Sequence, residues 1–121
     1  MLLKNILLSL LILVSIDSIY LYFTKTLFEK QILIIQNSPL KINMHGAIIC
    51  YIFLVFGLNY FILSPNKGIM DAFILGLVIY GVFESTSLAL FKKWPYYFVF
   101  MDTLWGGILF ALTTYIIRKI K

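Results

Sequence analysis

The sequence is poor in charge, because only 12% of its 121 residues are Asp, Glu, Lys or Arg. That share is about half of what an average soluble domain carries. Hydrophobic residues instead make up 62% of the chain. This composition argues against a water-soluble fold and predicts one small membrane domain covering residues 1–121.

The single cysteine and the lack of a basic cluster exclude further classes of structure and function. A single cysteine, Cys50, cannot form an internal disulfide. The ten Lys and Arg residues outnumber five acids, but they are scattered between apolar runs, whereas a nucleic-acid interface needs them gathered in a patch. We therefore expect the lipid bilayer, and no nucleic acid, as partner. A bundle of 14.0 kDa has little room for a pore, so a homo-oligomer or a larger membrane complex is an open alternative.

Four apolar runs are each long enough to cross a hydrocarbon core of about 30 Å. They must be helices, because four strands cannot close a barrel and lipid leaves no backbone group unpaired. The short turns at 64–68 and 92–95 make neighbouring helices hairpins. The sequence thus predicts an all-α, integral membrane, antiparallel four-helix bundle with spans at about 5–23, 45–63, 69–91 and 96–117.

The connection 24–44 mixes apolar with charged residues and is too short in apolar residues to span. We interpret it as a short interfacial helix between spans 1 and 2, ending near Pro39. It is either a lid over what the bundle holds or a loop that seals the bundle against lipid. The first run lacks a small-residue cleavage site, so we expect a retained span rather than a signal peptide.

Four spans put both termini on one side of the membrane. The ten basic residues divide equally between the two sides, so the positive-inside rule sets no orientation. The basic tail at 118–121 leads us to expect both termini in the cytosol. The multi-pass location leaves the membrane open, either a bacterial inner membrane or, for a viral chain, a host membrane.

Three carboxylates lie inside the apolar runs: Asp17, Glu84 and Asp102. Counted from the middle of each run, all three fall about 4–6 Å from the midplane, on the side away from the termini. Unpartnered acids at that depth cost about 3 kcal/mol each, and no Lys or Arg occurs inside the runs. The acids are therefore expected to share protons, to hydrogen-bond as neutral groups or to bind a cation.

Other polar residues lie near this acid layer. His45 begins the second run and is either a proton carrier or ligand, or an interfacial residue that water satisfies. We expect its helical face to point inward, through Ile49, Ile52 and Phe56 and nearly to Asn59. Ser87 lies one turn from Glu84.

Asp102 shares a helical face with Trp105 and Gly106, and Asp71 is expected only to cap a helix. Asp17-x-x-Tyr20 echoes Asp102-x-x-Trp105. The two acids fall in the same half of the membrane, so the echo does not indicate an inverted repeat.

Nearly the whole chain resembles a family of small four-span membrane proteins, domain of unknown function 2177. The motifs that carry the resemblance are Ile16-Asp17-Ser18-Ile19-Tyr20, Phe83-Glu84-Ser85-Thr86-Ser87-Leu88-Ala89 with Lys93-Trp94-Pro95, and Met101-Asp102-Thr103-Leu104-Trp105-Gly106. Tyr20 stands where the family pattern has Trp, and Glu84 where it has Asp. The resemblance implies the four-span fold and adds weight to the acid layer, but it implies no activity.

Our leading hypothesis is a proton- or cation-binding site made by Asp17, Glu84 and Asp102 in a small carrier or carrier subunit, with Tyr20, His45, Ser87 and Trp105 in support. One alternative is a structural or assembly protein whose protonated acids join helices. Another is an intramembrane lipid-modifying enzyme with the acids as general acid and base or as metal ligands, and with His45 assisting. We favour binding over catalysis. No cofactor motif is evident, and a bound cation is the one candidate ligand.

Overall fold

The computed structural model describes residues 3–120, and all regular structure in that part of the chain is helical. In chain order the elements are α1 (Leu3–Gln36), α2 (Met44–Leu58), the π-helical turn η1 (Asn59–Leu63), α3 (Ile69–Leu90) and α4 (Tyr96–Ile120). With η1 continuing α2, four helices are long and apolar enough to cross a membrane. The expected all-helical chain with four such helices is confirmed.

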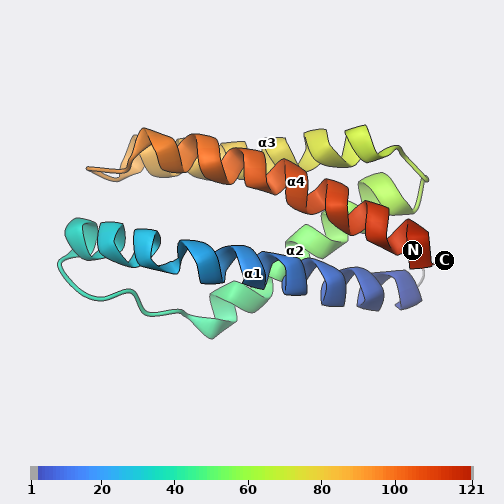
Figure 1. The fold of residues 1–121 in the computed structure, drawn as a ribbon, viewed down its shortest axis with the longest axis horizontal. Coiled ribbons are helices and arrows are strands. Elements are labelled where there is room, and N and C mark those ends of the chain that lie inside the picture. The colour runs from blue at the N-terminus through green and yellow to red at the C-terminus, as the bar shows by residue number, and fades with distance from the viewer. Residues whose placement is uncertain (1–2, 121) are drawn as a thin grey trace.

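The helices form two layers along one long axis (Figure 1). α3 and α4 lie side by side in one layer and share the most extensive contact, while α1 forms the other and α2 crosses obliquely behind it toward the level of α4. α1 packs on both α2 and α4, so it joins the layers. Both ends of the described chain lie at one end of the molecule, and the turn between α3 and α4 lies at the other (Figure 1).

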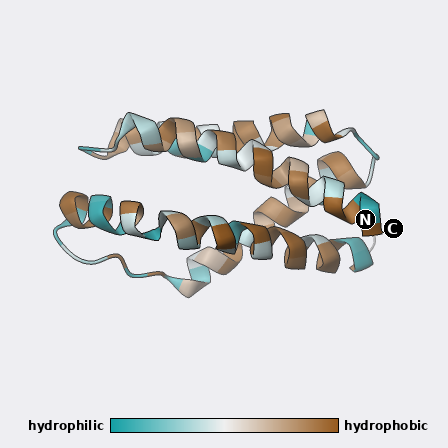
Figure 2. Ribbon diagram, in the orientation of Figure 1, coloured by the Kyte–Doolittle hydropathy of each residue, from teal (hydrophilic) through white to brown (hydrophobic). Residues whose placement is uncertain are grey.

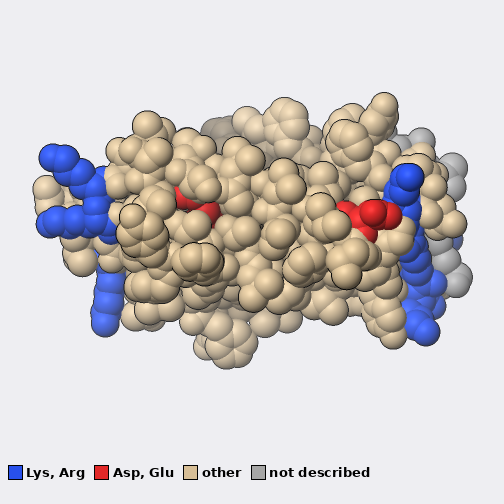
Figure 3. Space-filling model, turned by 90° about the horizontal axis from the view of Figure 1, so that it is seen from above, with Lys and Arg blue, Asp and Glu red and all other residues tan. Residues whose placement is uncertain are grey.

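Apolar side chains cover the outside of the molecule. Hydrophobic residues run along most of every helix, and the hydrophilic ones gather mainly near the ends and in the connections (Figure 2). Phe53 and Phe100, for example, are 70% and 74% exposed. On the face seen in Figure 3, Lys and Arg lie at the two ends of the long axis. Such an apolar belt between two charged ends suits a bilayer, because water would make this exposure unfavourable.

The segment 24–44 differs from the expected separate interfacial helix. Residues 24–36 continue α1 without a break, so α1 has 34 residues and measures about 51 Å at 1.5 Å per residue. No Gly or Pro interrupts this stretch, and α1 ends where Asn37 adopts a φ of 58°, a conformation that Asn tolerates.

The last part of α1, residues 24–36, which we call its outer end, contacts the start of α4. Phe28 packs on Phe98 with ring centroids 4.6 Å apart, and Gln31 Nε2 donates to the Lys93 carbonyl. These contacts hold the last part of α1 against the protein beyond the apolar run.

α3 and α4 approach closely because glycines face each other at the crossing. A Cβ placed on Gly76 would clash with the Gly106 carbonyl oxygen and lie 2.8 Å from its carbonyl carbon. A Cβ on Gly107 would lie 2.8 Å from Cε2 of Phe73. Small residues of this kind let membrane helices pack backbone to backbone.

We expect Gly76→Ala to lower the free energy of unfolding by about 1–3 kcal/mol, because the new methyl group forces α3 and α4 apart. Gly57→Ala is the matched control: its Cβ would meet nothing within 4 Å, so alanine should leave stability unchanged or raise it by up to about 1 kcal/mol. Thermal unfolding of both purified variants in lipid measures the difference, and equal behaviour would contradict the close crossing.

Candidate functional site

The inward stripe of α1 is polar. Its buried residues are Asn5, Ser9, Leu13, Asp17 and Thr24, and only Leu13 among them is apolar. Most of them recur every four residues, which places them on one face of the helix. Because the hydrocarbon core disfavours polar groups, this face turns toward α2 and α4.

Asp17 accepts hydrogen bonds from two other helices. Trp105 of α4 donates its Nε1–H to Oδ1 at 2.9 Å, and the Tyr51 hydroxyl of α2 donates to Oδ2. The side chain is only 6% exposed. With a donor on each oxygen, Asp17 has the partners that a buried carboxylate needs.

Asp102 and Tyr20 complete a crosswise exchange between α1 and α4. The Tyr20 hydroxyl donates to Oδ1 of Asp102, while Trp105 donates to Asp17. The rings of Tyr20 and Trp105 stack, with centroids 4.4 Å apart and planes 4° apart. The Asp-x-x-aromatic echo in the sequence thus has a structural meaning, because the aromatic residue of each motif donates to the acid of the other.

Glu84 of α3 is fully buried. Trp94, in the turn before α4, donates its Nε1–H to Oε1 at 3.0 Å. Within residues 3–120, no donor reaches the buried Oε2. The Asp102 carboxyl group lies close enough to Glu84 for the two charges to interact, and two carboxyl groups can form a hydrogen bond only if one of them is protonated.

These side chains come from all four helices and the turn before α4, and we call them the acid network: Asp17, Tyr20, Tyr51, Glu84, Trp94, Asp102 and Trp105. Every donor in it is an uncharged hydroxyl or indole group. Among residues 3–120, no group of three or more His, Cys, Asp or Glu side chains is placed to hold a metal ion.

The polar side chains expected to support the acids divide into two groups. The acid network includes Tyr20 and Trp105, whereas His45 lies exposed in the first turn of α2 and is not one of the acids' donors. Ser87 is buried one turn from Glu84, and its carbonyl accepts the Phe91 N–H where α3 ends. As expected, Asp71 caps α3, since its Oδ2 accepts the Gly68 N–H at 3.2 Å.

The prediction of which face of α2 points into the protein is wrong. Ile49, Ile52 and Phe56 are each more than half exposed, while the opposite side, with Tyr51, Leu54, Val55 and Leu58, faces the protein. α2 is apolar all round, so its hydrophobic pattern does not distinguish the side facing lipid from the side facing protein.

Sequence reasoning missed Tyr51 and Trp94. Tyr51 is one aromatic residue among many apolar ones, and nothing in its spacing sets it apart. Trp94 was assigned only to a turn, although it lies beside Pro95 in a motif that carries the family resemblance. Both became visible as functional only when the fold brought their polar atoms to the acids.

An apolar layer separates the acid network from the end of the molecule that holds the termini. Leu13, Leu58, Leu109 and Phe110 are fully buried there and belong to one cluster. Beyond this layer, Asn59 donates through Nδ2 to Ser9 Oγ and to the Val55 carbonyl, both at 2.8 Å. Asn59 also begins the π-helical turn, a local irregularity that often accompanies buried polar contacts.

Comparison with protein families gives one match that decides the chain's membership. The family model described as "Predicted membrane protein (DUF2177)" matches residues 2–117. The chain belongs to this family. The DUF2177 match covers all of the acid network, and the suspected resemblance is confirmed. Searches of curated proteins and of solved structures give no match.

Tyr51→Phe should lower the free energy of unfolding by about 1–2 kcal/mol, because it removes the hydroxyl that satisfies Oδ2 of Asp17. Tyr60→Phe is the control, since Tyr60 is 55% exposed and should change stability by less than about 0.5 kcal/mol. The Tyr51→Phe effect should shrink in an Asp17→Asn background, which a double-mutant cycle measures. Full additivity in that cycle would show that the contact carries no energy.

Proposed function

We propose that the Glu84 and Asp102 carboxyl groups bind a proton between them inside the membrane, in a small carrier or carrier subunit. The observation that carries this proposal is Oε2 of Glu84, which is buried without a donor from residues 3–120, in a carboxyl group close enough to Asp102 for their charges to interact. A proton on either carboxyl group supplies the missing hydrogen bond.

Electrostatics supports one bound proton. Two ionised carboxylates side by side, away from water, repel each other strongly, and each also loses its hydration. The groups that reach them here, Tyr20 and Trp94, donate hydrogen bonds but bring no positive charge. A shared proton removes one of the two negative charges and turns the repulsion into a hydrogen bond.

Asp17 has a different role in this proposal. Its two oxygens already accept hydrogen bonds from Trp105 and Tyr51, so it needs no shared proton to complete its hydrogen bonds. Through the stacked rings of Trp105 and Tyr20, the position of Asp17 is coupled to that of Asp102. We assign Asp17 the role of positioning these aromatic residues beside the proton-binding pair.

The other hypotheses fit the contacts less well. A cluster of three or more His, Cys, Asp or Glu ligands, of the kind that holds zinc, is not formed by residues 3–120. Acids that serve only to join helices should have every buried oxygen paired, as Asp17 does and Glu84 does not. General acid–base catalysis with His45 needs that side chain at the acids, but it lies exposed at the start of α2.

We further propose that the four helices cross the bilayer as an antiparallel bundle, with both termini on the cytosolic side. In this arrangement the outer end of α1, residues 24–36, lies at the opposite membrane surface. There Phe28 and Gln31 cover the turn that contains Trp94. The proton-binding pair is then separated from that surface by Trp94, and from the cytosolic surface by the apolar layer of Leu13 and its neighbours.

Infrared spectroscopy of the protein in lipid tests the proposal through the protonated-carboxyl band. At neutral pH we expect this band in the wild type and its loss or displacement in Glu84→Gln and in Asp102→Asn. Glu29→Gln is the control, because Glu29 is exposed on α1 and should leave the band unchanged. Sodium, magnesium or zinc should not remove the band.

A band that disappears when one cation is added would contradict the proposal and indicate an ion site. The absence of a protonated-carboxyl band at every pH above about 5 would also contradict it. A band that is the same in all three variants would place the proton elsewhere.

A further inference from the structure

An apolar groove runs between α1 and α2 on the outside of the bundle. Its cavity volume is about 740 Å³, and its walls include Leu7, Leu10 and Val14 of α1 and Ile48, Tyr51 and Ile52 of α2. A second hollow of about 500 Å³ lies farther along α1 toward its first residues and shares Leu7 and Leu11 with the first. Because they share these walls, the two hollows form one feature, which we call the α1–α2 groove.

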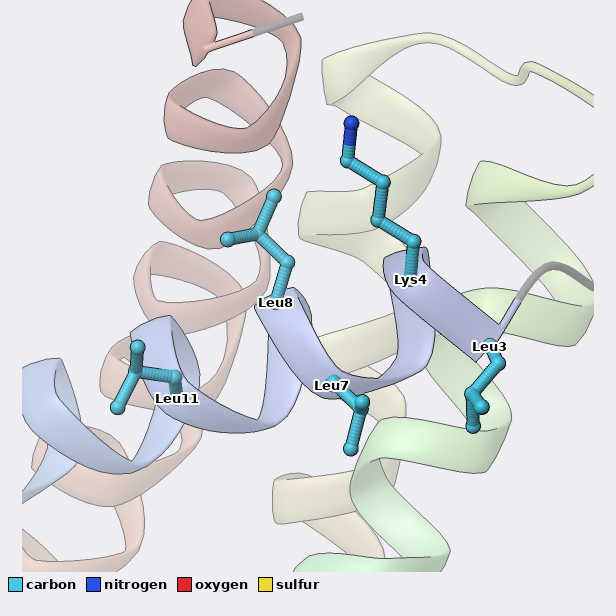
Figure 4. A pocket seen from close by; sticks show the side chains of 5 residues that line it. All are labelled: Leu3, Lys4, Leu7, Leu8 and Leu11. Atoms are coloured by element: carbon cyan, nitrogen blue, oxygen red, sulfur yellow. The ribbon is translucent and has the colours of Figure 1, made fainter.

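The groove changes character at the end nearest the termini. Figure 4 shows that the second hollow is lined by Lys4 and four leucines, so that one ammonium group stands at the end of an apolar surface. Lys4 is exposed. Other cations belong to the same end of the molecule, where Arg118 of α4 donates to the Lys67 carbonyl.

The length of the groove matches one leaflet of a bilayer. Lys4 and Val14 are ten residues apart, which is about 15 Å along a helix. A hydrocarbon core of about 30 Å gives each leaflet the same depth, about 15 Å. With Lys4 at the membrane surface, the apolar part of the groove therefore reaches the depth of an acyl chain of that leaflet.

We propose that the α1–α2 groove binds one anionic phospholipid of the leaflet on the side of the termini. One acyl chain lies along the apolar walls, and the phosphate group pairs with the Lys4 ammonium group. Basic side chains at the ends of membrane helices attract anionic headgroups, and the apolar walls gain dispersion contacts that an empty groove lacks.

A second copy of the chain fits the groove less well. Two copies with the same orientation in the membrane are related by an axis along the membrane normal, and their contact is isologous. Packing through this groove would bring the two Lys4 ammonium groups to the same depth and toward each other. Like charges brought together in this way are unfavourable, whereas an anionic headgroup neutralises Lys4.

The groove also borders the acid network. Tyr51 forms part of its wall and donates its hydroxyl to Asp17, so a bound acyl chain would pack against a residue of the network. The lipid site is independent of whether Glu84 and Asp102 share a proton, and each can fail without the other.

Native mass spectrometry of delipidated protein titrated with dioleoylphosphatidylglycerol or dioleoylphosphatidylcholine tests the proposal. The wild type should retain one phosphatidylglycerol and prefer it to phosphatidylcholine about fivefold, the effect of one lysine near the surface. Lys4→Gln should abolish the preference. Leu11→Trp and Ala47→Phe, which fill the groove, should each lower the retention of both lipids at least fivefold.

Two controls keep the charge and size changes but move them away from the groove. Lys119→Gln removes a cation from the same end of the molecule, and Val82→Phe enlarges an exposed residue of α3. Both should behave like the wild type. If Leu11→Trp or Ala47→Phe is misfolded by circular dichroism, the other variant decides.

Three outcomes would overturn the proposal. The wild type could bind the two lipids equally, the groove-filling variants could retain phosphatidylglycerol as well as Val82→Phe does, or the wild type could appear as a dimer that Ala47→Phe dissociates. The last result would assign the groove to a second copy. None of them changes the carboxyl band expected for Glu84, so the two proposals are tested separately.

Discussion

A carboxyl group inside a hydrocarbon layer must find its hydrogen-bond partners within the protein, and the arrangement of this molecule depends on that constraint. The Asp17 carboxyl group accepts its hydrogen bonds from two other helices, through Tyr51 of α2 and Trp105 of α4. Glu84 likewise draws Trp94 from the turn that follows α3. The acids thus determine which faces of the helices meet, in a chain whose apolar side chains are equally suited to lipid and to the protein interior.

The contact between α3 and α4 depends on glycines and not on hydrogen bonds to the acids. The glycine contact and the hydrogen bonds together produce the site. Glycines at 76, 106 and 107 bring these two helices into close contact, which holds Glu84 and Asp102 in neighbouring positions on separate helices. The crosswise exchange between α1 and α4 then fixes Asp102 through Tyr20. A pair of carboxyl groups without a compensating cation follows from this packing, and a bound proton is the simplest way to stabilise it.

The sequence predicted the number of helices, because the length of an apolar run follows directly from helix geometry, and it singled out three acids that the fold buries. It did not predict the inward face of α2, the role of Tyr51 or the continuation of α1 to Gln36. Hydrophobic periodicity identifies a buried face only when the other face is polar, and α2 has no polar face. The useful pattern was the spacing of the few polar residues, since Asn5, Ser9 and Asp17 already mark the inward side of α1.

The central claim is that one proton resides on the Glu84–Asp102 pair. Solid-state NMR of the protein in lipid bilayers tests it most directly, with ¹³C in the side-chain carboxyl groups of Asp and Glu, of which the chain has five in total. At neutral pH the account predicts one neutral carboxyl group, or one shared proton, on Glu84 and Asp102. Ionised signals from both Glu84 and Asp102 would contradict it.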